Sequence, residues 1–90
     1  MPLKQATPAH FNGGDILLDM IDENGSLVHG HVEGEALIGY AVRRGIEGEP
    51  DEILDAALLE IVRVASDKFD GYPVKPSTIY VLTSDLNPKG

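Results

Sequence analysis

Two segments of the chain differ in the periodicity of their hydrophobic residues. Residues 15–33 hold two short apolar or alternating runs on either side of Asn24-Gly25, a pattern typical of a β-hairpin. Residues 51–69 instead repeat apolar side chains at helical spacing. Together the two rhythms predict a small α+β domain.

Alternate residues of a strand share a face, so the first strand of the hairpin is expected to bury Ile16, Leu18 and Met20. Its other face mixes acidic residues with Leu17 and Ile21. Such a mixture is typical of a sheet that is only partly covered on its second side. We therefore expect one face of the sheet to remain open in the isolated chain.

Residues 35–44 can be read in two ways. Apolar positions at i, i+3 and i+4 favour a short helix, and Arg43 and Arg44 before Gly45 are typical of a helix C-terminus. A continued strand over residues 37–42 is the competing interpretation, because Gly39 weakens a helix.

Residues 51–69 predict the longest helix, with Pro50 at its first position, and residues 78–83 predict a final strand. The predicted fold is a two-layer α+β domain of order β-β-α-α-β, with a small, mainly antiparallel sheet and helices on one face. We expect one face of the long helix to pack on the hairpin and the last strand. The helix residues assigned to this core are Leu54, Leu58, Ile61 and Ala65.

The ends of the chain lack clear periodicity. Residues 1–12 are predicted to form a flexible N-terminal arm that Phe11 anchors to the core. Residues 13–86 form the single predicted domain, and 87–90 a C-terminal tail, with one last turn over residues 84–90 as an alternative. Ninety residues are enough for one core and not for two lobes around a long cleft.

The chain is acidic, with 15 Asp and Glu against 7 Lys and Arg and a net charge of −8. No Lys or Arg lies between Lys4 and Arg43, although six acids do. Phosphate backbones are bound mainly through Lys and Arg, so we expect neither nucleic-acid nor anionic-membrane binding. The acidity is explained by solubility or by a face that docks a basic partner.

The chain has no cysteine, and no apolar run reaches the length of a membrane span. Its first eight residues contain no apolar core of a signal peptide. These features predict a cytoplasmic protein.

The sharpest candidate for chemistry is His29-x-His31-x-Glu33. On a strand the three side chains project from one face, and two imidazoles with a carboxylate can hold zinc or iron. The alternative is a polar, solvent-facing side of the strand, where the side chains stand side by side and do not converge. We favour this alternative and predict neither a metal nor another cofactor.

The order of landmarks resembles a small bacterial family called domain of unknown function 1488. The matching segments are residues 32–37, residues 65–69 with their Ala-x-x-x-Phe pattern, and residues 80–86 with a Leu-Thr…Asp ending. The resemblance covers about residues 11–86 and implies a two-layer α/β fold. It transfers no catalytic residue.

No nucleophile, acid–base pair or phosphate-binding loop is recognisable, so the chain is not expected to be an enzyme. We predict a non-enzymatic protein-interaction or regulatory module, and a small metal- or ligand-binding protein using His29, His31 and Glu33 as the alternative. A homodimer is one way to cover the apolar residues Leu17, Ile21 and Leu27 on the open face.

Overall fold

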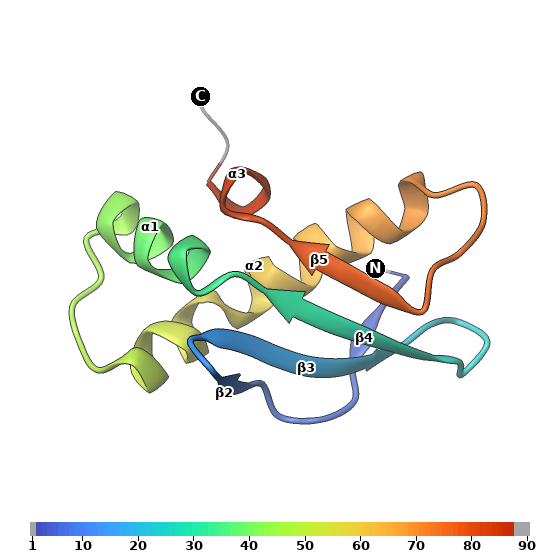
Figure 1. Ribbon diagram of the computed structural model, residues 1–90, viewed down its shortest axis with the longest axis horizontal. Helices are drawn as coiled ribbons and strands as arrows, with labels where there is room; N and C mark the ends of the chain where they lie inside the picture. Colours follow the sequence, from blue (N-terminus) through green and yellow to red (C-terminus); the bar gives the residue numbers. More distant parts are fainter. Residues whose placement is uncertain (1, 88–90) are drawn as a thin grey trace.

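The predicted hairpin forms the centre of the sheet in the computed structural model, which describes residues 2–87 (Figure 1). β3 (Asp15–Ile21) pairs antiparallel with β4 (Leu27–Val32), with Leu18 opposite Gly30. The turn places Gly25 at φ +81° and closes with a hydrogen bond from the Asp22 N–H to the Ser26 carbonyl. Glycine suits this position because a positive φ costs it nothing.

The final strand closes the sheet on the other side of β4. β5 (Thr78–Val81) runs parallel to β4, with His31 opposite Tyr80. A parallel neighbour requires a long crossover, which α1 (Gly34–Arg44) and α2 (Pro50–Gly71) supply. A short α3 (Thr83–Leu86) follows β5.

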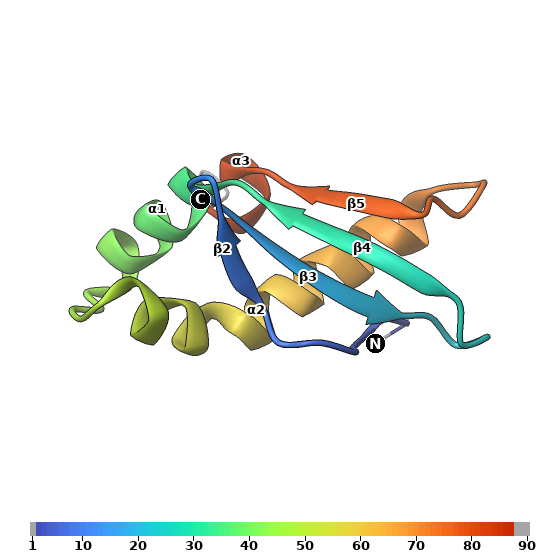
Figure 2. The same ribbon diagram turned by 60° about the horizontal axis from the view of Figure 1, so that its bottom comes forward.

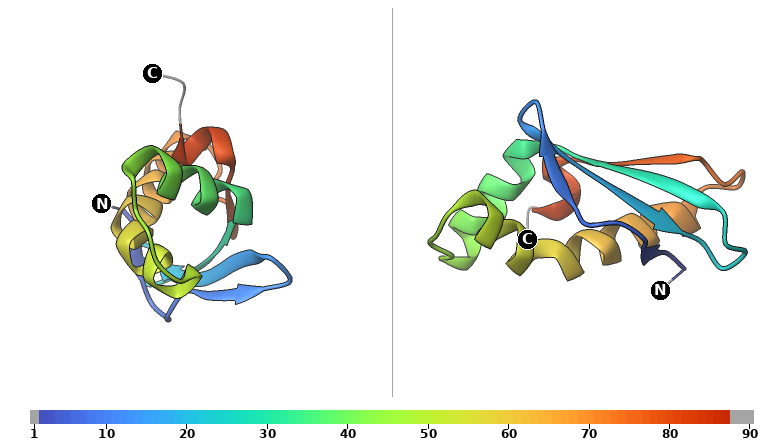
Figure 3. Two further views of the ribbon diagram at one scale, coloured as in Figure 1. Left: turned by 90° about the vertical axis from the view of Figure 1, so that its left-hand side faces the viewer. Right: turned by 90° about the horizontal axis from the view of Figure 1, so that it is seen from below.

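The helices cover one face of the sheet and leave the other free (Figures 2 and 3). The mainly antiparallel α+β architecture predicted from the sequence is therefore confirmed.

Residues 34–44 are helical, so the strand interpretation of 37–42 is wrong. Gly45 ends α1 in the left-handed region, at φ +64°, and its N–H bonds back to the helix. Pro50 occupies the start of α2, and the Glu49 N–H donates to Glu52 Oε1 over 3.1 Å. Both ends follow the end signals in the sequence.

The N-terminal segment adds two short strands that the sequence did not predict. β1 (Lys4–Gln5) and β2 (His10–Asn12) each pair antiparallel with β3. Leu3 is fully buried, and its N–H donates to Ser66 Oγ at 3.3 Å. Phe11 is 38% exposed and is not part of the core, so the residue that anchors this segment is Leu3 and not Phe11 as predicted.

The core lies between α2 and the inner sheet face, as expected. Leu54, Ile61 and Ala65 are buried. Leu58 is only half-buried at the margin of the core, which corrects its assignment to the inner face. The inner face of α2 is centred on Ala57 and Ile61, which are both fully buried. Leu58 comes one residue after Ala57, so its side chain is turned away from the centre of this face.

Residues 83–86 form α3, so residues 84–86 agree with the alternative of one last turn. The last strand ends at Val81, two residues before the predicted end at Thr83. The Asn87 side chain donates to the Ala36 carbonyl at 2.9 Å and thereby joins this end of the chain to α1. Residues 88–90 lie outside the described residues.

Candidate functional site

The two strand histidines project from the open face of the sheet, where each contacts its own carboxylate. His29 Nδ1 lies 2.7 Å from Asp19 Oδ1, directly across the β3–β4 ladder. His31 Nε2 lies 2.8 Å from Asp15 Oδ2. Both pairs are substantially exposed, in agreement with the polar-face interpretation.

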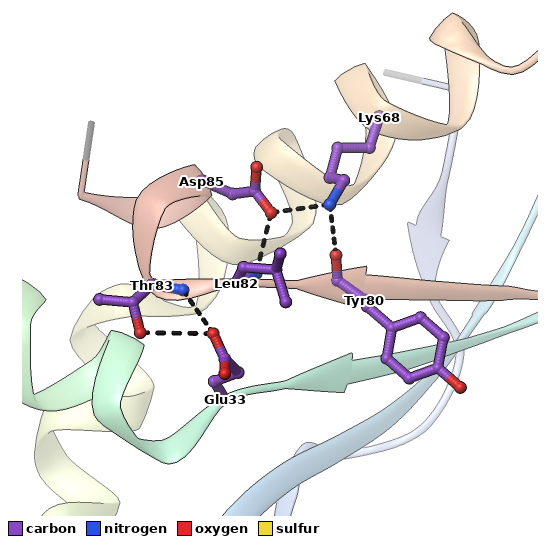
Figure 4. Close-up of polar contacts among 6 residues, drawn as sticks. All are labelled: Glu33, Lys68, Tyr80, Leu82, Thr83 and Asp85. Carbon is purple, nitrogen blue, oxygen red and sulfur yellow. Dashed lines mark hydrogen bonds and ion pairs between the residues drawn. The ribbon is translucent and has the colours of Figure 1, made fainter. Parts of the chain in front are cut away.

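Glu33 does not join the histidines. Its Oε1 accepts a 2.8 Å hydrogen bond from the Thr83 N–H and a 3.4 Å bond from Thr83 Oγ1 (Figure 4). This contact ties the β4–α1 junction to the β5–α3 junction. Among residues 2–87, no group of three His, Cys, Asp or Glu side chains is arranged to hold a metal ion.

Lys68 and Asp85 close the outer edge of β5 nearby. Lys68 Nζ donates to Asp85 Oδ2 and to the Tyr80 carbonyl, each over 2.7 Å, while Asp85 Oδ2 also accepts the Leu82 N–H at 2.9 Å (Figure 4). Burial raises the pKa of Asp85, but the bonds from Lys68 and the Leu82 N–H outweigh it and hold the pKa below its usual value. The charges of Lys68 and Asp85 satisfy one another, and the Lys68 bond occupies the Tyr80 carbonyl on the outer edge of β5, so we assign this cluster a structural role.

The open sheet face is only weakly apolar. Leu17 and Ile21 are half-buried and Leu27 is 51% exposed. His31 lies opposite Leu17 on one side and Tyr80 on the other, and the rings of His31 and Tyr80 have centroids 5.5 Å apart. Alternating charged and apolar side chains make this face a poorer docking surface than its sequence pattern indicated.

A hollow lies at one end of the sheet, between α1, the start of α2 and the β2–β3 turn. It has a volume of about 540 Å³. These three parts of the chain meet at the left of Figure 1 and face the viewer in the left panel of Figure 3. Its apolar lining consists of Phe11, Leu37, Ile38, Pro50 and Ile53.

A second hollow, of about 340 Å³, continues the first along α1 toward the α1–α2 loop. The two share Ile38 and Ile53, and the second adds Val42 and Ile46. Ile38 is 66% exposed and Val42 77% exposed, one turn apart on α1. We call the two hollows together the α1 groove.

The rim of the α1 groove is acidic. Asp15, Glu33, Glu35 and Glu47 line it, and none of its described lining residues is Lys or Arg. Hydrogen bonds from His31 and from the Gly34 N–H, the latter 3.0 Å long, hold the pKa of Asp15 below its ordinary value. Asp15 is therefore ionised at neutral pH, and the groove combines an apolar floor with fixed negative charge.

The backbones of Gly14 and Gly34 approach each other closely at one end of the α1 groove. A Cβ on Gly34 would lie 1.9 Å from the Gly14 carbonyl oxygen, far inside ordinary contact distance. The turn of β2 and β3 is thus pressed against the first residue of α1. This close approach shapes one end of the α1 groove.

The α1 groove was not predicted from the sequence. One signal was available, because Ile38 and Val42 are apolar at i and i+4 yet lie off the buried stripe of Leu37, Tyr40 and Ala41. An apolar pair outside the core-facing stripe of a short helix indicates a second contact surface. The contributions of Phe11 and Ile53 could not be read from spacing, since both come from distant segments.

Comparison with protein-family models, curated proteins and solved structures found no match to this chain. The resemblance to domain of unknown function 1488 stays a prediction. No helix in the described part of the chain combines the length and hydrophobicity of a membrane span.

Proposed function

We propose that the protein is a non-enzymatic interaction module whose α1 groove binds a segment of another protein that carries apolar and basic side chains. The observation that carries this proposal is the groove itself, which has an apolar floor, a carboxylate rim and no Lys or Arg among its described lining residues. Apolar anchors supply binding energy, and charge on the rim steers and selects the partner.

Exposure supports the same surface. Ile38 and Val42 are among the most exposed large apolar side chains of the described chain, and they lie in one contiguous patch. A partner that covered them would remove apolar area from water, at about 25 cal/mol per Å². Glu35 is exposed on the rim and free to meet a Lys or Arg of the partner.

Two short synthetic peptides test the proposal. Both carry leucine along one face, and the other positions are lysine in the first and glutamate in the second. We expect the lysine peptide to bind, to shift backbone amide resonances of the α1 groove, and to weaken as salt is added. The glutamate peptide should bind at least about tenfold more weakly, because the rim repels it.

Matched variants locate the binding. Ile38→Glu should abolish binding of the lysine peptide, while Val74→Glu, at an 82%-exposed apolar residue away from the groove, should leave it intact. Glu35→Lys should weaken binding of the lysine peptide more than Glu23→Lys, because Glu23 lies in the β3–β4 turn and not on the α1 groove. Equal binding of the two peptides, or full binding by Ile38→Glu, would contradict the proposal.

A further inference from the structure

All three histidines of the chain lie on the open face of the sheet. His10 of β2 and His31 of β4 are both opposite Leu17 of β3, and His29 is opposite Asp19. Residues that stand opposite one another in a ladder share a face of the sheet. The side chains that ordinarily titrate near neutral pH are thus gathered on one side of the molecule.

His31 is joined to the α1 groove through Asp15. Asp15 is one of the residues that line the groove, and its Oδ2 lies 2.8 Å from His31 Nε2. Its Oδ1 accepts the Gly34 N–H, at the start of α1, over 3.0 Å. The carboxylate that His29 contacts, Asp19, is not among the described lining residues of the groove.

The contact with Asp15 determines which nitrogen of His31 takes up a proton. An ionised carboxylate can only accept hydrogen bonds, so Nε2 is the donor and Nδ1 is left to bind the second proton. The His31 side chain is 37% exposed, which gives it access to protons from water. Asp15 stays ionised near neutral pH, so protonation of His31 changes the pair from net negative to neutral.

The other charged groups near His31 have contacts of their own. Asp19 lies 2.7 Å from His29, and Glu33 accepts bonds from Thr83. Asp15 is therefore the carboxylate whose net charge follows the protonation of His31. The titratable groups around His31 are Asp15 and Asp19 of β3, His29 of β4, Glu33 directly after β4, Glu35 of α1 on the groove rim, Tyr80 of β5, and His10 of β2 beyond Leu17.

We propose that protonation of His31 weakens binding at the α1 groove, so that the groove binds a basic segment at neutral pH and releases it in mild acid. This inference rests on the proposed function, because it concerns the regulation of the same site. Asp15 attracts a Lys or Arg of the bound segment while His31 is neutral, and the imidazolium cancels that attraction once it forms. One charge at the edge of a water-exposed groove changes a dissociation constant by about three- to tenfold.

The leucine–lysine peptide, with its N-terminus acetylated, tests the proposal at about pH 8 and about pH 5.5. Its lysines and the carboxylates of the rim stay charged over this range, whereas histidines titrate within it. For the wild-type chain we expect the dissociation constant to rise about three- to tenfold at the lower pH. In His31→Gln the rise should fall below about twofold, because the amide can still donate to Asp15 but takes up no proton.

His29→Gln and His10→Gln are the matched controls. Each removes one histidine of the same sheet face without touching the Asp15 contact, so each should keep the wild-type pH response. A pH response that persists in His31→Gln, or that His29→Gln removes equally, would overturn the proposal. Circular dichroism at both pH values checks that each variant is folded.

The free protein supplies a readout that needs no peptide. Because the Gly34 N–H donates to Asp15, its amide resonance should move as His31 titrates, and this movement should be lost in His31→Gln. A peptide that binds equally at both pH values would overturn the regulation and leave the proposed function standing. A peptide that binds at neither pH would instead overturn the proposed function, and the regulation with it.

Discussion

Gly34→Ala should destabilise the protein, although alanine is the better helix former. A Cβ at Gly34 would lie 1.9 Å from the Gly14 oxygen and 3.1 Å from the Gly14 carbonyl carbon. To relieve the contact, either the turn or the start of α1 must move by about 1 Å, and overpacking of this kind costs about 1–3 kcal/mol. The same movement stretches the hydrogen bond from the Gly34 N–H to Asp15.

The helix-propensity gain of alanine, about 0.5–1 kcal/mol, offsets only part of this cost. The two terms leave a net loss of about 1 kcal/mol. With a slope of about 1 kcal/mol per molar urea for a small domain, the urea midpoint should fall by about 1 M.

Gly71→Ala is the matched control. Gly71 ends α2 with no atom within 4 Å of a built Cβ, and its φ is not positive. The control should raise the midpoint slightly, because alanine reduces the entropy of the unfolded chain. A Gly34→Ala variant that unfolds at or above the wild-type midpoint would refute the close approach of the turn to α1.

Two further predictions concern the core and the groove wall. Ile61→Ala should lower the free energy of unfolding by about 2–5 kcal/mol, because Ile61 is fully buried. Leu58→Ala should cost roughly half as much, because Leu58 is half-buried. A lower urea midpoint for Leu58→Ala than for Ile61→Ala would mean that α2 is rotated relative to the sheet. Hydrogen bonds from His31 and the Gly34 N–H hold the pKa of Asp15 below its ordinary value. The ionised carboxylate therefore stabilises the fold at pH values above the ordinary pKa of 3.8, and this contribution is lost as the pH falls through the lower pKa of the folded state. The urea midpoints of wild type and Asp15→Asn should therefore differ at neutral pH and converge in strong acid, and a constant difference would contradict the role of the charge.

Local signals predicted the elements whose formation depends on neighbouring residues. Ile16, Leu18 and Met20 are all buried, as their alternation predicted. Pro50 begins α2, as expected. The identity of residues 37–42 could not be decided locally, because a short apolar run with one glycine fits a strand or a helix. The parallel β4–β5 pairing decides it, since the chain needs a covering crossover between these strands.

The N-terminal strands show a different limit. A strand of two or three residues has too few positions to display a period, so β1 and β2 leave no readable pattern. Their pairing with β3 and the burial of Leu3 beside Ser66 join residues far apart in sequence. The position of Glu33 follows the same principle, because Thr83, which it contacts, lies 50 residues away.

The sequence by itself determined the α+β class, the central hairpin, the long helix and the acidity, because periodicity and charge are local properties of the chain. Only the tertiary structure decided what these elements make together. In the folded chain His29, His31 and Glu33 each contact a different partner. The α1 groove forms where a strand, a turn and two helices meet. A site built from distant segments depends on how they pack, and packing is specified by the whole core rather than by any spacing within one segment.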